Sequence, residues 1–295
     1  MVSQTTTPFF SGAFEPSLVL KSASVGRVGL IVSDLQRSLD FYAGVIGLDV
    51  LTQTLNSAQL GVTADEGVLL ELEQRPGVRP LRAKRLGLYH TALLLPSRSA
   101  LASFAEHLHR SGIRAGSSDH LVSEAFYLED PDGLTMEVYA DRERELWPWR
   151  GKELDAAVLP LNMASLLATP HTPWNGTPRG TVMGHMHLHI GDLKRAEQLY
   201  RHGLGMSLRT RSIPNALFLA AGDYHHHVGL NTWAGSVPAA CEGDARLSWW
   251  ELFVPDGDSS RLREQATASG WQPGQDGALV DLWGISLKLA SKTEA

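Results

Sequence analysis

The pattern of apolar and polar positions near the start of the chain predicts a strand followed by an amphipathic helix. An apolar run ends at Ser33 and Asp34, whose short polar side chains are preferred at helix N-caps. Leu35, Leu39 and Tyr42 then recur at the spacing that places apolar side chains on one face of a helix. This stretch therefore indicates a strand that passes directly into a helix packed against a core.

The same pattern returns in the second half of the chain without a gap. Four residues of the first strand–helix segment have an identical residue 158 positions later. The matching pairs are Asp34 and Asp192, Leu35 and Leu193, Tyr42 and Tyr200, and Gly47 and Gly205. Four such matches at one spacing indicate an internal duplication of the chain.

A fainter repeat lies within each half. Residues 87–114 and 246–271 both show an apolar run that ends near a proline, then a helical stretch, then a Ser-Gly pair. Short strands follow around the turns at 130–133 and 281–284. Each unit thus consists of a strand, a helix and two or three short strands. Four such units predict a fold of the α+β class.

The middle of the chain has a different composition, with a charged run and several tryptophans and prolines. We therefore divide the chain into an N-terminal arm (1–23), an N-terminal domain with units one and two (24–140), a linker (141–180) and a C-terminal domain with units three and four (181–291). The linker is expected to pack by its tryptophans. The alternative is a lid over the functional site.

Three histidines share one face of a predicted strand at 184–190. His185, His187 and His189 alternate with apolar residues, and successive side chains of a strand point to opposite faces. A second group of histidines follows at 225–227. Neutral imidazole is the commonest side-chain metal ligand, so these histidines together predict a metal site. The alternative is a half-buried strand with incidental histidines.

Composition limits the classes of function. Of the 295 residues, 43% are hydrophobic and 20% charged, which is typical of a folded globular protein. The net charge of −6 argues against nucleic acid and anionic membranes as partners. The single cysteine, Cys241, excludes thiolate metal clusters, so a metal must be held by nitrogen and oxygen. The absence of a signal-like start and of an apolar run of roughly 18 residues predicts a cytoplasmic protein.

Four stretches together resemble the vicinal oxygen chelate superfamily, which includes glyoxalase I, extradiol dioxygenases and bleomycin-resistance proteins. These stretches are 87–96, 119–128, 184–189 and 224–233, and the resemblance covers about residues 25–290. The nearer likeness is to Bacillus-type catechol-2,3-dioxygenase-like proteins. The resemblance implies four βαβββ units in two tandem domains, with mixed curved sheets that form cups.

In this superfamily each unit offers one metal-ligand position on its first strand and one on its last strand. The first-strand positions are here Arg27, His90, His185 and Trp249, and the last-strand positions are Glu71, Glu137, His227 and Lys288. Unit four offers Trp249 and Lys288, which do not serve as ligands at neutral pH, and unit one offers Arg27, a cation that would repel a metal ion. We therefore expect units one and four to form a degenerate second cup that has become packed core.

The resemblance thus implies a metal site between units two and three. The implied ligands are His90, Glu137 and His185. In the familiar extradiol enzymes the ligands come from units three and four, so this chain departs from that pattern. Two imidazoles and one carboxylate with open positions are typical of non-haem Fe(II) oxygenases.

The function implied is that of an Fe(II) extradiol dioxygenase that cleaves a catechol- or hydroquinone-type aromatic with O2. Mn(II), Zn(II) and Ni(II) are the alternative metals, and a homo-oligomer is one expectation for the assembly. Candidate catalytic residues are His120, Tyr139, His187 and His227. The alternatives for two of them are a solvated loop histidine at His120 and a core tyrosine at Tyr139.

Two other functions stay open at this point. A glyoxalase-like isomerase or lyase would use four protein ligands, with His227 joining the other three. A non-catalytic protein would bind a planar ligand, for which eight tryptophans supply stacking surface. The number of protein ligands on the metal separates the first of these from a dioxygenase.

Overall fold

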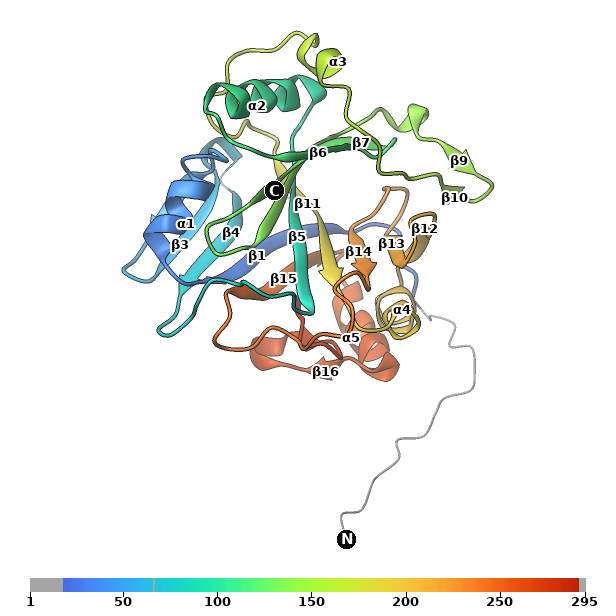
Figure 1. The fold of residues 1–295 in the computed structure, drawn as a ribbon. Helices are drawn as coiled ribbons and strands as arrows, with labels where there is room; N and C mark the ends of the chain where they lie inside the picture. Colours follow the sequence, from blue (N-terminus) through green and yellow to red (C-terminus); the bar gives the residue numbers. More distant parts are fainter. Residues whose placement is uncertain (1–17, 66, 292–295) are drawn as a thin grey trace.

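The computed structural model describes residues 18–65 and 67–291, and these contain the four predicted βαβββ units in order (Figure 1). Unit one comprises β1 (Ser24–Val32), α1 (Leu35–Tyr42), β2 (Asp49–Gln53), β3 (Ser57–Val62) and β4 (Gly67–Gln74). Unit two comprises β5 (Gly87–Leu94), α2 (Arg98–Arg110), β6 (Gly116–Asp119), β7 (Ser123–Glu129) and β8 (Thr135–Asp141).

Units three and four repeat this order after the linker. Unit three comprises β11 (Val182–His189), α4 (Leu193–Ala196), the helical turn η3 (Glu197–Gly203), β12 (Ser207–Thr210), β13 (Ala216–Ala220) and β14 (Val228–Asn231). Unit four comprises β15 (Arg246–Val254), α5 (Asp258–Ser269), β16 (Gln272–Pro273), β17 (Leu279–Val280) and β18 (Ser286–Ser291). The linker contains β9 (Trp149–Arg150), β10 (Glu153–Leu154) and α3 (Met163–Leu167). No helix among the described residues is long and apolar enough to span a membrane.

The helices begin where the sequence predicts. The carboxylate of Asp34 accepts a hydrogen bond from the backbone N–H of Arg37, and Asp192 does the same for Arg195. In unit two, the Ser97 hydroxyl caps α2 in the same way. These caps satisfy N–H groups that have no partner within the helix.

The four units form two eight-stranded sheets, and each sheet takes one unit from each half of the chain. One sheet has the order β16-β17-β18-β15-β1-β4-β3-β2, from units four and one. The other has the order β12-β13-β14-β11-β5-β8-β7-β6, from units three and two. The boundaries at 140 and 181 therefore separate consecutive pairs of units and not the two sheets.

The alternation along β11 gives its two faces different roles. Met186 and Leu188 are fully buried in the main hydrophobic core. That core also contains Leu30 of β1 and Trp250 of β15, from the other sheet. The histidines of β11 project to the opposite face, the concave side of their sheet. Burial of Met186 and Leu188 in the core therefore determines which face of β11 presents the histidines.

The cup of units one and four holds a charged network where a packed core was expected. One nitrogen of the Arg27 guanidinium lies 2.9 Å from Glu71, and another lies 3.0 Å from Glu251. The Lys288 ammonium lies 3.7 Å from the centre of the Trp249 ring. The Glu251 side chain is only 5% exposed, so its charge depends on Arg27 for compensation. The Arg27 guanidinium and the Lys288 ammonium thus supply the positive charge of this cup.

Replacing Arg27 with alanine should lower stability without changing metal content. The buried carboxylate of Glu251 would lose its partner, which costs about 1–3 kcal/mol. Urea denaturation and metal analysis of Arg27→Ala would measure the two effects. Arg75→Ala is the matched control, because Arg75 pairs with Glu73 at the surface and such pairs contribute about 0–1 kcal/mol. Loss of metal from Arg27→Ala would show that the metal site depends on the cup of units one and four.

Candidate metal centre

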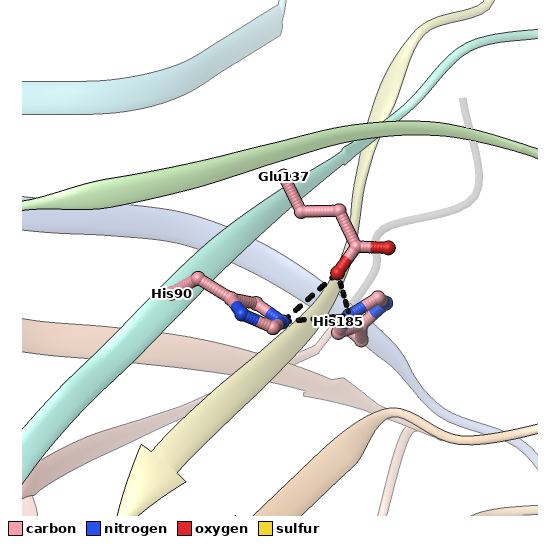
Figure 2. A group of neighbouring side chains, drawn as sticks. All are labelled: His90, Glu137 and His185. Carbon is pink, nitrogen blue, oxygen red and sulfur yellow. Dashed lines mark hydrogen bonds and ion pairs between the residues drawn. The ribbon is translucent and has the colours of Figure 1, made fainter. Parts of the chain in front are cut away.

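Three side chains from three neighbouring strands converge in the cup of units two and three (Figure 2). His90 lies on β5, Glu137 on β8 and His185 on β11. The carboxylate oxygen of Glu137 lies 3.0 Å from His90 Nε2 and 3.3 Å from His185 Nε2. The two Nε2 atoms are 3.3 Å apart. All three residues are buried.

The strand register brings these residues together. β5 and β8 are parallel, and Ala92 pairs with Glu137, so the carboxylate lies two residues beyond His90. β5 and β11 are antiparallel, and Ala92 also pairs with His185. Neighbouring strands lie about 4.8 Å apart, so side chains on one face at these positions can meet at a single point.

The spacing of the three atoms fits one bound metal ion. Metal–ligand bonds of about 2.0–2.2 Å, at angles between about 90° and 109°, place ligand atoms about 2.8–3.6 Å apart. The three observed separations of 3.0, 3.3 and 3.3 Å all lie in this range. The donor set of two nitrogens and one oxygen also matches the facial arrangement of non-haem iron sites.

The protonation states of His90, Glu137 and His185 also favour binding of a metal cation. Burial lowers the pKa of both His90 and His185, which keeps these imidazoles neutral. Burial would raise the pKa of Glu137, but His185 and His90 outweigh that effect and its pKa falls well below the usual value. Two neutral imidazoles and one carboxylate carry a net charge of −1. This is the form in which these groups bind metals.

The fourth ligand position of this cup is a glycine. In unit two, Glu137 pairs with the residue two positions beyond His90. In unit three, the residue two positions beyond His185 is His187, which pairs with Gly229. A Cβ atom on Gly229 would lie 2.9 Å from the His187 ring. Gly229 thus occupies in unit three the backbone position that Glu137 occupies in unit two. It offers no side chain to a metal, and the His187 ring fills the space beside it.

The assignment of His227 to this position therefore needs correction. His227 lies two residues before Gly229 and does not line the cup. Its Nδ1 accepts a hydrogen bond from the backbone N–H of Ala221. Strand β14 begins only at Val228, so the alternation rule does not extend to the three histidines before it.

Tyr139 lies behind the candidate ligands and not on the cavity wall. It is fully buried, its ring packs against His185, and its hydroxyl lies 2.7 Å from the Tyr224 hydroxyl. Gly184 makes this contact possible, since a Cβ there would overlap the Tyr139 hydroxyl. The position of Tyr139 suits support of the His185 ring and not direct contact with a bound phenolate.

A cavity of about 230 Å³ opens beside the three candidate ligands. Two other sequence-predicted residues, His120 and His187, line it. Tyr127, which sequence reasoning missed, also lines it, as does His226 of the 225–227 group, from which the sequence favoured His227. Tyr127 pairs with Glu137 across the hairpin, so counting back from the turn at 130–133 would have found it.

The linker fixes the tautomer of His120. Its Nδ1 lies 2.9 Å from the carbonyl oxygen of Ala157, which can only accept, so Nδ1 carries the proton. In the neutral ring Nε2 is then an acceptor, and it lies 2.6 Å from the Tyr127 hydroxyl. Tyr127 and His120 are thus hydrogen-bonded, and the pair forms a path from the cavity to the linker.

A second path of hydrogen bonds begins at Asp141. Its carboxylate lies 2.9 Å from His225 Nε2, so that nitrogen donates. Nδ1 of the same ring lies 2.7 Å from His226 Nδ1. Burial lowers the pKa of His226 well below its ordinary value, so this ring is neutral. A proton on Nδ1 of this neutral ring, in the hydrogen bond to His225, leaves a lone pair on Nε2.

Asn231 fixes the tautomer of His187. The amide oxygen of Asn231 accepts from the backbone N–H of Trp233, so its nitrogen faces His187 Nε2 at 2.9 Å. That nitrogen donates, so His187 Nε2 accepts and the imidazole proton lies on Nδ1. The cavity is thus lined by an imidazole donor, His187, and an imidazole acceptor, His226.

Comparison with known proteins identifies the family. A sequence model of the Glyoxalase/Bleomycin resistance protein/Dioxygenase superfamily matches residues 24–138. Catechol-2,3-dioxygenase of Bacillus subtilis (strain 168) is 40% identical over 238 residues, which cover 78% of this chain and 82% of that protein. The chain belongs to this superfamily. Its predicted membership is therefore confirmed.

Solved structures show the superfamily fold over nearly the whole chain. A putative dioxygenase from Bacillus subtilis superposes with a TM-score of 0.61 at 17% identity, covering 92% of this chain and 86% of that one. Glyoxalase I from Zea mays superposes with a TM-score of 0.54 at 17% identity, covering 92% of both chains. The superfamily fold with its four βαβββ units is therefore confirmed.

Proposed function

We propose that the chain is a metal-dependent extradiol dioxygenase that cleaves a catechol- or hydroquinone-type aromatic ring with O2. The observation that carries this proposal is the meeting of His90, Glu137 and His185 at the wall of a small cavity. The similarity to catechol-2,3-dioxygenase supports a dioxygenase-type enzyme. Fe(II) is the metal that this donor set favours, with Mn(II), Zn(II) and Ni(II) as alternatives.

When bound, Fe(II) would act as a Lewis acid toward the substrate oxygens and offer positions for substrate and O2. The chain supplies the proton-handling groups. We assign His226 Nε2 to accept a proton from a substrate hydroxyl, with Asp141 and His225 behind it. Tyr127, hydrogen-bonded to His120, would orient the ring from the other wall. His187 would donate from Nδ1 to an oxygen of the substrate.

Gly229 supports a dioxygenase over a glyoxalase-like isomerase. A glyoxalase-like site needs a fourth protein ligand, and the position equivalent to Glu137 in unit three has no side chain. With only three protein ligands, a bound ion would keep positions for a catechol and for O2.

Ring cleavage tests the proposal directly. Protein loaded with Fe(II) without air should, on exposure to O2, convert catechol, alkylcatechols or hydroquinones with stoichiometric O2 uptake. Catechols should give a yellow ring-fission product. Protein that holds one equivalent of Fe(II) but cleaves none of these compounds would refute the proposal. A lack of metal in protein purified without chelator would favour the non-catalytic binder.

Metal should also stabilise the fold. The proposed ligands lie on three strands from both halves of the chain, so only the folded chain brings them together. Metal at a hundred times its Kd should add about 2.7 kcal/mol to the free energy of unfolding. Thermal melts with and without Fe(II) and EDTA would measure this effect. Melting that is unchanged by either would contradict a site between units two and three.

A further inference from the structure

The linker spans the open side of the sheet that carries the candidate metal centre. Leu159 exchanges two backbone hydrogen bonds, both 2.9 Å, with Asp119 at the end of β6. The hydroxyl of Ser212, just beyond β12, donates to the carbonyl of Ala156 at 2.8 Å. β6 and β12 are the two edge strands of this sheet, and β10 lies beside β12 (Figure 1). The segment 153–159 therefore joins the two edges and covers the cup.

Alternate side chains of this segment face the cavity. Leu154, Ala156 and Val158 line it, as the two-residue period of an extended chain requires. Leu154 is buried at 2% exposure, whereas Val158 lies at the rim and is 59% exposed. Ile213 and Phe218 of unit three extend the same apolar wall. Aliphatic and aromatic groups thus form this wall of the cavity, whereas Ser118, Ser123 and Thr210 add hydroxyl groups to the rest of the lining.

The cavity contains no cation from a lysine or an arginine. None of the described residues that line it is of either type. Arg98 and Arg142, which lie nearby, both pair with Glu124. A carboxylate on a bound ring would therefore be buried without a lysine or arginine to compensate its charge, which is unfavourable. The cavity, at about 230 Å³, is also below the roughly 300–1,000 Å³ of pockets for drug-sized ligands.

We infer that segment 153–159 of the linker acts as a specificity wall. It restricts the site to single-ring dihydroxybenzenes with small, uncharged, apolar substituents. The inference rests on the proposed function, since it names the substrate class of the same site. It also gives the linker a role in recognition.

Binding without O2 tests this wall independently of turnover. Anaerobic calorimetry on the Fe(II)-loaded protein would compare 4-methylcatechol with 3,4-dihydroxybenzoate, which differ at one substituent. We expect 4-methylcatechol to bind at least tenfold more tightly. Val158→Arg places a cation at the rim, and we expect it to reduce that preference at least tenfold. Aerobic kcat/KM ratios should change in the same direction.

Leu159→Arg is the matched control. Leu159 is 44% exposed and does not line the cavity, so the same charge one residue away should leave the preference unchanged. Equal binding of both probes by the unaltered protein would overturn the inference while leaving the proposed function intact. Equal effects of the two arginine variants would also overturn it. Failure of both probes to bind would instead refute the proposed function, and the inference with it.

Discussion

Replacing His185 with alanine is expected to abolish stoichiometric metal binding, whereas His187→Ala and His189→Ala should retain the metal. Residues two apart on a strand are separated by about 6.6–6.8 Å, and a metal–nitrogen bond is only about 2 Å long. One ion therefore binds only one of these three imidazoles. His185 Nε2 lies 3.3 Å from both other candidate ligand atoms. His187 and His189 instead hydrogen-bond to Asn231.

Metal analysis after anaerobic loading and removal of excess Fe(II) would distinguish the three variants. Circular dichroism would confirm that each one is folded. His187→Ala and His189→Ala are the matched controls, because they remove the same group from the same face of β11. One equivalent of metal in His185→Ala, together with its loss from either neighbour, would reverse the assignment of the ligand.

Replacing His226 with phenylalanine is expected to reduce kcat about 10²–10⁴-fold and to leave the metal in place. The imidazole is assigned to take a proton from the substrate hydroxyl, and phenylalanine keeps the ring but has no acceptor. The His226 ring packs against His185 at 4.2 Å between centroids, so an aromatic replacement preserves that contact. Single-turnover kinetics with Fe(II)-loaded protein and 4-methylcatechol would measure the loss.

His227→Gln is the companion variant. The sequence alone favours His227 as the functional histidine of the 225–227 run, whereas the structure places His226 on the cavity wall. We expect His227→Gln to retain kcat within a few-fold, because its ring lies outside the cavity. A large loss in His227→Gln together with normal turnover in His226→Phe would favour the assignment made from the sequence.

The sequence by itself determined the properties that follow from local periodicity and from the repeat. The alternation along 184–190 fixed which side chains of β11 face the core and which face the cup. The superfamily resemblance implied that His90 and His185 occupy equivalent first-strand positions, and the unsuitable residues at Arg27 and Trp249 pointed to the middle units. These inferences succeed because side-chain direction in a regular strand depends only on parity.

Only the tertiary structure decided the features that depend on irregular backbone or on distant contacts. Residues 225–227 precede β14 and follow no strand period, so the sequence could not tell which of their rings enters the cavity. Only the register of β11 and β14 showed that Gly229 occupies the position where a fourth metal ligand would lie. The linker became a wall because its backbone pairs with Asp119 of β6 and accepts a hydrogen bond from the Ser212 hydroxyl just beyond β12. Such contacts join residues far apart in the chain, and no local pattern encodes them.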